Sequence, residues 1–148
     1  MTFETFKQTV ARVKEVDINP RISMTGQGES TLHSELEDFV RYATDEGVTV
    51  HMTTNANLLD KETSQKLIEA GLAGVTFSVS DFDEDYELVY NLNFEKTRTN
   101  ILDFLEVRES FPDKDIGVLV SIVIHDLNKH KIDDMKAFWN KAGIDFVM

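Results

Sequence analysis

Helical and strand-like segments alternate along the whole of this 148-residue chain, and this alternation is the strongest restriction on its fold. Strands that are separated by helices in this way form parallel sheets with helices packed against them. The sequence therefore predicts an α/β fold of five parallel strands in a single domain, residues 1–148. The expected strands are at about 21–25, 48–53, 75–80, 117–124 and 144–147.

The expected strands alternate polar and apolar residues, whereas the strands of an ordinary parallel sheet are apolar throughout. In the second strand, His51, Thr53 and Asn55 alternate with Val50 and Met52. Because successive side chains point to opposite faces of a strand, each strand has an apolar face toward the helices and a polar face. We expect the sheet to curve into a partial (β/α) barrel, open and with outer helices, whose polar concave face receives a ligand. A sheet with one merely solvated face is the alternative.

A glycine-rich turn, Gly26-Gln27-Gly28-Glu29, follows the first strand directly. Glycines let a backbone approach a ligand closely, because they carry no Cβ. Ligands of parallel α/β proteins bind at the carboxyl ends of the strands. Polar residues gather at the same end of other strands, at 53–55, 78–81 and 125–128. The sequence thus predicts a ligand site at this edge, although a Gly-x-Gly turn taken alone is also a common structural connection.

The order of these motifs resembles the core domain of the radical S-adenosylmethionine (SAM) superfamily. Residues 25–29, Thr-Gly-Gln-Gly-Glu, are similar to the T-G-x-G-E form of the family's glycine–glutamate motif, with Ser30 in place of the usual proline. Further matches follow in the family's order, so the resemblance spans about residues 3–147. They are Thr53-Thr54-Asn55-Ala56, Glu69-Ala70-Gly71-Leu72 and the strand 75–80.

The resemblance implies cofactor-binding roles for residues at the predicted rim. Gly26, Gly28 and Glu29 would meet the amino group of SAM. Thr53 and Asn55 would face its methionyl or ribose part. Ribose or carboxylate contacts are implied for Ser78, Ser80 and Asp81, and contacts with the adenosine for Ser121, Val123 and Asn128. No catalytic residue and no metal ligand is predicted in this chain.

The chain has no cysteine, whereas the family holds its [4Fe-4S] cluster with three cysteines spaced C-x3-C-x2-C. The cluster is therefore not expected on this chain. The resemblance places the cysteines upstream of Met1 and the last residues within the sixth strand, so we expect a core fragment of a radical SAM enzyme. The complete enzyme would cleave SAM to a radical that takes hydrogen from an unknown substrate, and the fragment alone would be inactive. The alternative is a non-catalytic module of the same fold that binds SAM, another nucleoside or a protein.

Two further interpretations use residues of the predicted concave face. His51 and Glu29 could serve as the acid and base of an ordinary barrel isomerase or lyase. Two histidines with Asp81 or Glu29 could form a metal site without cysteine. No pair of these residues has a spacing that is diagnostic of either site.

A net charge of −12 argues against nucleic acid and against anionic membrane surfaces as partners. No apolar run approaches the roughly 20 residues of a membrane span, and the first residues do not form a signal peptide. We expect a cytoplasmic protein. The bare edge strands of an incomplete barrel would favour self-association or pairing with a missing N-terminal segment.

Overall fold

The computed structural model describes residues 1–148, apart from the side chain of Asp83. Its five strands form one sheet, in which every pair of neighbours is parallel and each strand pairs with the next in sequence. The strands are β1 (Arg21–Met24), β2 (Thr49–Thr54), β3 (Leu72–Ser78), β4 (Gly117–Ser121) and β5 (Phe146–Val147). Strands β1 and β5 are therefore the edges, and the predicted open, partial barrel is confirmed.

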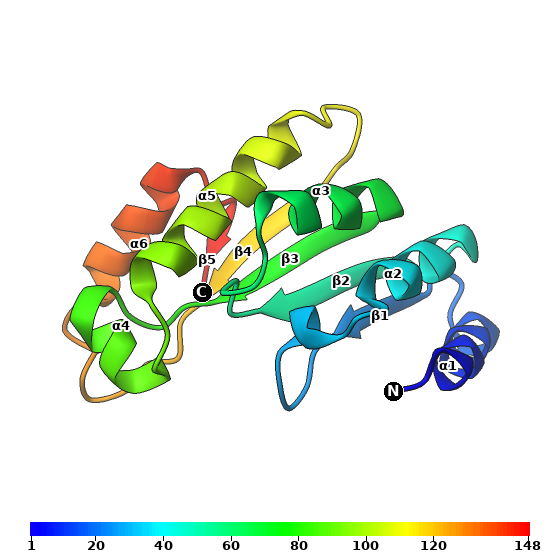
Figure 1. The fold of residues 1–148 in the computed structure, drawn as a ribbon, viewed down its shortest axis with the longest axis horizontal. Helices are drawn as coiled ribbons and strands as arrows, with labels where there is room; N and C mark the ends of the chain where they lie inside the picture. The colour runs from blue at the N-terminus through cyan, green and yellow to red at the C-terminus, as the bar shows by residue number, and fades with distance from the viewer.

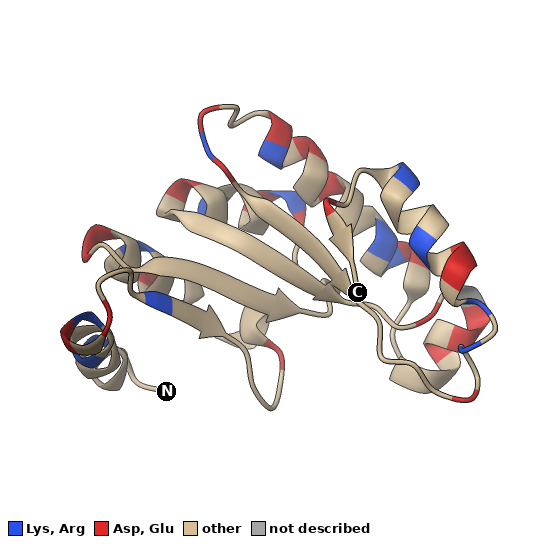
Figure 2. Cartoon of the chain, turned by 180° about the vertical axis from the view of Figure 1, so that it is seen from behind, with Lys and Arg blue, Asp and Glu red and all other residues tan. Residues whose placement is uncertain are grey.

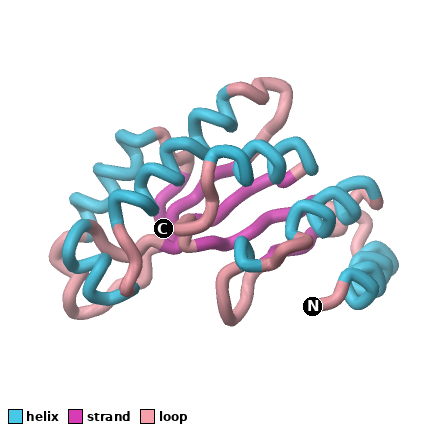
Figure 3. Tube along the Cα trace, viewed as in Figure 1, coloured by secondary structure: helices cyan, strands magenta, loops and turns pink.

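The helices cover one face of this sheet (Figures 1 and 3). They are α2 (Leu36–Asp45), α3 (Lys61–Ala70), α5 (Phe94–Glu109) and α6 (Ile132–Ala142). Helix α1 (Phe3–Val16) lies at the β1 edge, and the 3-10 turn η1 (Ser30–Leu32) and α4 (Asp83–Tyr90) follow the carboxyl ends of β1 and β3. Seen from behind in Figure 2, the other face of the sheet is uncovered. No helix in the described part of the chain is long and apolar enough to span a bilayer.

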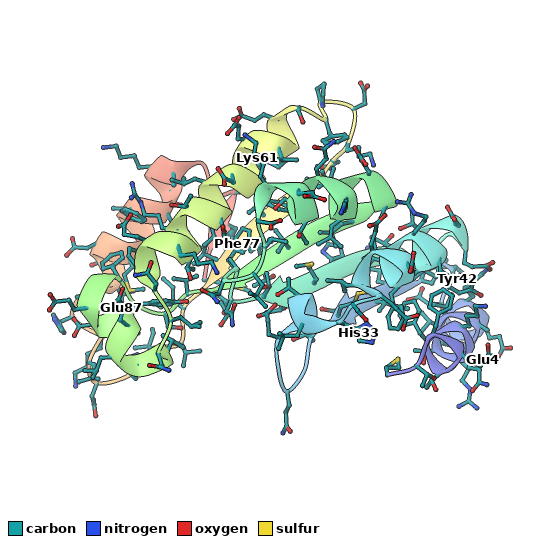
Figure 4. All side chains as sticks on the ribbon, in the orientation of Figure 1. Glu4, His33, Tyr42, Lys61, Phe77 and Glu87 are labelled. Atoms are coloured by element: carbon teal, nitrogen blue, oxygen red, sulfur yellow. The ribbon has the colours of Figure 1, made fainter. Side chains whose placement is uncertain are left out.

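The core lies between the sheet and its helices, as the alternation in the strands predicts. Val50 and Met52 of β2, and Phe77 of β3, are at most 1% exposed. Phe104 of α5 meets Phe77, which is labelled in Figure 4, edge-on with ring centroids 5.6 Å apart. Burying an aliphatic or aromatic side chain of this size stabilises a fold by about 1.5–3 kcal/mol, so this layer fixes the sheet against the helices.

Several element boundaries differ from the expected ones. Strand β3 begins at Leu72, and its register with β2 shifts between the pairs Val50–Leu72 and His51–Gly74. The sequence did not predict this start, because Ala73 and Gly74 have low strand propensity. Strand β4 ends at Ser121, because the N–H of Val123 donates to Ser80 Oγ (2.8 Å). The sequence predicts a last helix at about 129–142, but α6 starts at residue 132 because tight backbone turns occupy 125–131. Strand β5 starts at residue 146, because the N–H of Val118 donates to the side chain of Asp145 (2.8 Å) and not to a backbone carbonyl.

The uncovered face of the sheet, which we call the open face, carries the polar half of each strand. Ser23, His51, Thr53 and Thr76 are exposed or half-buried, and their neighbours on the helix side are largely buried. Toward the β5 edge the open face becomes apolar, with Phe146 59% exposed. The open face is therefore polar on β1–β3. The glycine turn lies at the carboxyl end of β1.

Candidate ligand-binding site

The carboxyl ends of β1, β2 and β3 border a hollow of about 300 Å³. Six of the predicted cofactor-binding residues line it together: Gly26, Gly28, Glu29, Thr53, Asn55 and Ser78. Thr25 and Thr54 complete the strand side, and the opposite wall is formed by Tyr90, the last residue of α4, and Leu92, in the α4–α5 connection. A second hollow, of about 460 Å³, runs from the same turn around the β1 edge to α1. The turn thus lies between two open spaces.

Gly28 holds the turn in a conformation that other residues adopt at a cost. Its φ is +112°, in the region that an L side chain rarely occupies. A Cβ added at this position would meet no atom within 4 Å, so the backbone conformation, and not crowding, requires glycine here. The turn consequently presents bare backbone to the hollow.

The carboxylate of Glu29 joins the glycine turn to the end of β2. Oε1 accepts hydrogen bonds from the Thr31 N–H (3.0 Å), the Thr31 hydroxyl (2.8 Å) and the Thr54 hydroxyl (2.5 Å). Oε2 accepts one bond, from the Asn55 N–H (2.8 Å). An ionised carboxylate has about four lone-pair positions, so Oε2 retains the capacity to accept a bond from a ligand cation such as an ammonium group.

Ser30, which stands where the family motif has proline, ties the same two strands together. Its hydroxyl lies 3.0 Å from the carbonyl oxygen of Met24 and 3.3 Å from that of Thr53. The strand end is shaped further by Asn55, whose side chain accepts a bond from the Asn57 N–H (2.9 Å), and by Ala56, which has a left-handed φ of +61°. These contacts hold the rim in place without a ligand.

Ser80 and Asn128 lie beside the rim in a buried hydrogen-bond network. Both are 0% exposed. Asn128 Nδ2 donates to the carbonyls of Ser80 (2.5 Å) and Val123 (2.8 Å), and its Oδ1 accepts from the His125 N–H (2.8 Å). Their polar atoms are thus engaged in joining β3 to the loop after β4. Ser121 pairs in register with Ser78, whereas Val123 is 61% exposed in that loop.

Asp81 forms a buried ion pair with Lys131. Its Oδ1 accepts from the Phe82 N–H (2.9 Å) and lies 2.6 Å from Lys131 Nζ, which also reaches Asp85 (2.5 Å). Burial lowers the pKa of Lys131, but its bonds with the two aspartates outweigh burial, and the pKa is raised. Lys131 in turn lowers the pKa of Asp85. This arrangement fixes α4 against the segment that precedes α6.

Three contributors to the site were not predicted from the sequence. Thr54 occupies the apolar phase of β2, and a polar residue there signals a buried partner, which is Glu29. Tyr90 ends α4 and Leu92 follows it, and the sequence pattern there gives no indication that this segment returns to the rim. Only the path of the chain between β3 and α5 brings them there.

The residues described here do not form a metal centre. No group of three or more His, Asp or Glu side chains that could hold an ion occurs among them, and the sequence has no cysteine. A thiolate-ligated iron–sulfur cluster therefore has no ligands in this chain. The acid–base pair of an isomerase gains no support either, because the carboxylate of Glu29 is engaged at the rim and His51 lies four residues before Asn55 on β2.

The chain has the α/β fold of an open parallel sheet, with a polar rim and a glycine turn at the carboxyl ends of its strands. The family model described as the radical SAM superfamily matches residues 1–138. The chain therefore belongs to the radical SAM superfamily.

Curated relatives agree with this assignment. The PqqA peptide cyclase of Bradyrhizobium diazoefficiens is 27% identical over 138 residues, which are 91% of this chain and 34% of that protein. The Fe-coproporphyrin III synthase of Methanosarcina barkeri is 35% identical over 66 residues, 45% of this chain and 16% of that protein. The chain thus spans about a third of the length of the first of these relatives.

Solved structures show the same fold at low sequence identity. Native anSMEcpe with bound AdoMet and Cp18Cys peptide superposes with a TM-score of 0.73 and 18% identity, over 99% of this chain and 42% of that one. BtrN in complex with AdoMet and 2-DOIA gives a TM-score of 0.52 and 19% identity, over 81% of this chain and 44% of that one. The similarity at these identities concerns the fold.

Proposed function

We propose that this chain is the SAM-binding core of a radical SAM enzyme. The observation that carries the proposal is the set of hydrogen bonds from the end of β2 to the carboxylate of Glu29, which we call the clasp. Glu29 lies at the end of the glycine turn, lines the hollow and keeps one acceptor position open. Membership of the superfamily supports the choice of SAM as the ligand. The relatives bound to AdoMet, anSMEcpe and BtrN, support it further.

The amino-acid part of SAM would lie in the hollow of about 300 Å³. Its ammonium group would bond to Glu29 Oε2 and to backbone carbonyls of the turn, since a carboxylate is the strongest acceptor available there. The hydroxyls of Thr53 and Ser78 would meet the methionyl or ribose part. We assign the adenosine side to Ser121 and Val123. Ser80, Asp81 and Asn128 would act there by holding the wall, because their side chains are buried and bonded within the protein.

In the complete enzyme, SAM would be cleaved reductively at an iron–sulfur cluster. This chain supplies no cysteine for that cluster, so we expect it to bind SAM without cleaving it. The substrate of the complete enzyme would be a peptide or a small molecule. Support for both classes comes from the PqqA peptide cyclase, from anSMEcpe with its peptide and from BtrN with 2-DOIA.

The test is isothermal titration with SAM and with 5′-methylthioadenosine, which lacks the amino-acid part. We expect SAM to bind at least about 10-fold more tightly, because one charge-assisted hydrogen bond contributes about 1.5–3 kcal/mol. Thr53→Val should weaken SAM binding several-fold. Thr49→Val is the matched control: Thr49 lies on the same strand and face, about 13 Å below Thr53. Equal effects of the two substitutions would contradict the proposed rim site.

The absence of cysteine also favours a second candidate function, a non-catalytic module that binds a nucleoside. The same titration distinguishes the two. If 5′-methylthioadenosine binds as tightly as SAM, the hollow recognises the nucleoside, and Glu29 has only a structural role.

We further propose that the edge strands β1 and β5 permit self-association or pairing with another segment. Each of them pairs with one neighbour only, and an unpaired strand edge is a template for further pairing. Sedimentation velocity over a 100-fold concentration range would test this. A single monomeric species at every concentration would contradict self-association.

A further inference from the structure

The five strands of the sheet contain a single charged residue, Arg21, and a single histidine, His51. Arg21 pairs in register with Thr49, and Ser23 with His51. These residues alternate with Val50 and Met52, which are buried on the helix side, so all four lie on the open face. From the spacing of strands and residues, the Cα atoms of Arg21 and His51 are about 8 Å apart. The two basic side chains can therefore reach one ligand group.

Small residues surround His51 on the open face. Ser23, Gly74 and Gly117 occupy the same row of the sheet on β1, β3 and β4. The imidazole lies directly over Gly74, where an added Cβ would stand 2.5 Å from Nδ1. A Cβ at Gly117 would meet nothing within 4 Å, so the space beyond the ring is open. This row of small residues therefore leaves the imidazole of His51 as the one large side chain on its part of the open face.

Neither basic residue has a partner within the described part of the chain. The hydrogen bonds and ion pairs found there include none from the side chain of Arg21 or His51. Two acids of the nearby loops have other partners: Glu46 pairs with Lys14 (2.6 Å), and Asp17 accepts from the Asn19 N–H (2.9 Å). Figure 2 shows the strands of the open face without acidic residues and with one basic segment at the start of β1. In a chain with a net charge of −12, this pair of basic residues is a local exception to the acidic surface.

We propose that Arg21, His51 and Ser23 form an anchoring subsite for a carboxylate of the enzyme's substrate. A carboxylate fits because a single guanidinium can bind it bidentately and neutralise its one charge. A phosphate group fits less well. Its second charge needs a second cation, and Arg21 is the one charged side chain that the five strands carry.

The subsite lies below the rim on the same face of the sheet. His51 precedes Asn55 by four residues of extended chain, a height of about 13 Å. A substrate anchored there by its carboxylate would extend toward the SAM site at the rim. This role as a substrate anchor rests on the proposed function, whereas the anion subsite itself depends only on the residues of the open face.

The test uses the whole chain, labelled with ¹⁵N and ¹³C, and glutarate as the probe. We expect glutarate to shift the His51 imidazole and Ser23 amide signals to saturation, and neutral glutaramide to leave them unchanged. Arg21→Gln should weaken glutarate binding about 10-fold or more, and His51→Gln should weaken it several-fold. Arg12→Gln is the matched control, since it removes the same charge from an exposed position on α1 and should have no effect.

Three results would overturn the subsite: equal effects of Arg21→Gln and Arg12→Gln, shifts at His51 that glutaramide also produces, or tighter binding of inorganic phosphate than of glutarate. The fluorescence of Trp139, which is buried, verifies that each variant is folded. A separate titration with SAM keeps the two proposals apart. If SAM fails to bind while glutarate binds as expected, the rim proposal fails and the subsite stands; Arg21→Gln should leave SAM binding unchanged.

Discussion

The clasp formed by Glu29 predicts a large loss of stability on replacing the carboxylate with its neutral isostere. In Glu29→Gln, the amide oxygen can take the place of Oε1 and keep the three bonds from Thr31 and Thr54. In the native chain, Oε2 accepts a bond of 2.8 Å from the N–H of Asn55. In the variant the amide nitrogen takes the place of Oε2, so two hydrogen-bond donors face each other. One charge-assisted bond is lost and three others become neutral.

The expected cost follows from these contacts. Losing a hydrogen bond to a charged group costs about 1.5–3 kcal/mol, and neutral bonds are roughly half as strong as charged ones. Because Glu29 is only partly buried, we expect a total loss of about 2–4 kcal/mol in the free energy of unfolding. For a chain of this size, each kcal/mol lowers Tm by about 2–4 °C.

Urea unfolding followed by the fluorescence of Trp139 measures this loss. Trp139 is the single tryptophan and is 0% exposed, so its emission reports on the packing of α6 against the sheet. Glu35→Gln is the control, because Glu35 is exposed beside the same loop and makes no capping bond; we expect a change within about 0.5 kcal/mol. If Glu29→Gln costs no more than Glu35→Gln, the reasoning about the clasp is wrong.

Three further predictions concern the supporting structure. Lys131→Met should lower the free energy of unfolding by about 3–5 kcal/mol, because it leaves Asp81 charged and buried; adding Asp81→Asn should recover much of this in urea unfolding, and no recovery would contradict an ion-pair role. Burial raises the pKa of Tyr86. The neutral phenol therefore contributes fully to the free energy of unfolding below the ordinary tyrosine pKa of about 10, and this contribution is lost as the pH rises through the folded-state pKa. Unfolding curves of Tyr86→Phe between pH 8 and 11 should therefore decline less than those of the native chain. Asp60 is the N-cap of α3, and its hydrogen bond from the N–H of Thr63 lowers its pKa. The charged carboxylate therefore stabilises the fold fully above the ordinary aspartate pKa. This stabilisation is lost as the pH falls through the lowered pKa of the folded state. Asp60→Asn should remove that acid-dependent part, whereas Asp60→Ala should cost about 1 kcal/mol at pH 7; identical acid titrations of Asp60→Asn and the native chain would exclude the effect.

Much of the fold could be predicted from the sequence, because its determinants are local. The period-2 alternation of His51, Thr53 and Asn55 with apolar neighbours determined which face of β2 is covered by helices. Gly71 adopts the left-handed conformation of a helix cap and ends α3, a position that glycine favours. The start of β3 was placed three residues late, because Ala73 and Gly74 have low strand propensity and are held in the sheet by their neighbours on both sides.

The candidate site could be predicted only in part, because contacts across strands are not encoded at any fixed spacing. The rim residues Gly26, Gly28 and Glu29 were found from the turn chemistry, and Thr53, Asn55 and Ser78 from their position at strand ends. That Asn128 uses its amide to bond the backbone of Ser80 and Val123 was not evident, since Ser80 is 48 residues away in sequence and the contact with Val123 depends on the fold of the loop after β4. Their contact with a cofactor stays a prediction.

The sequence by itself determined the parallel α/β architecture, the polar open face and the glycine turn, since each arises from the alternation of side chains or from the conformations available to glycine. The tertiary structure decided what those residues meet. It turned the carboxylate of Glu29 toward Thr54 and Asn55, brought Tyr90 and Leu92 to the rim, and laid the ring of His51 on Gly74 beside Arg21. The physical reason is that hydrogen bonds and close packing act over a few ångströms in space, and the register of the strands and the path of their connections set which distant residues come within that range.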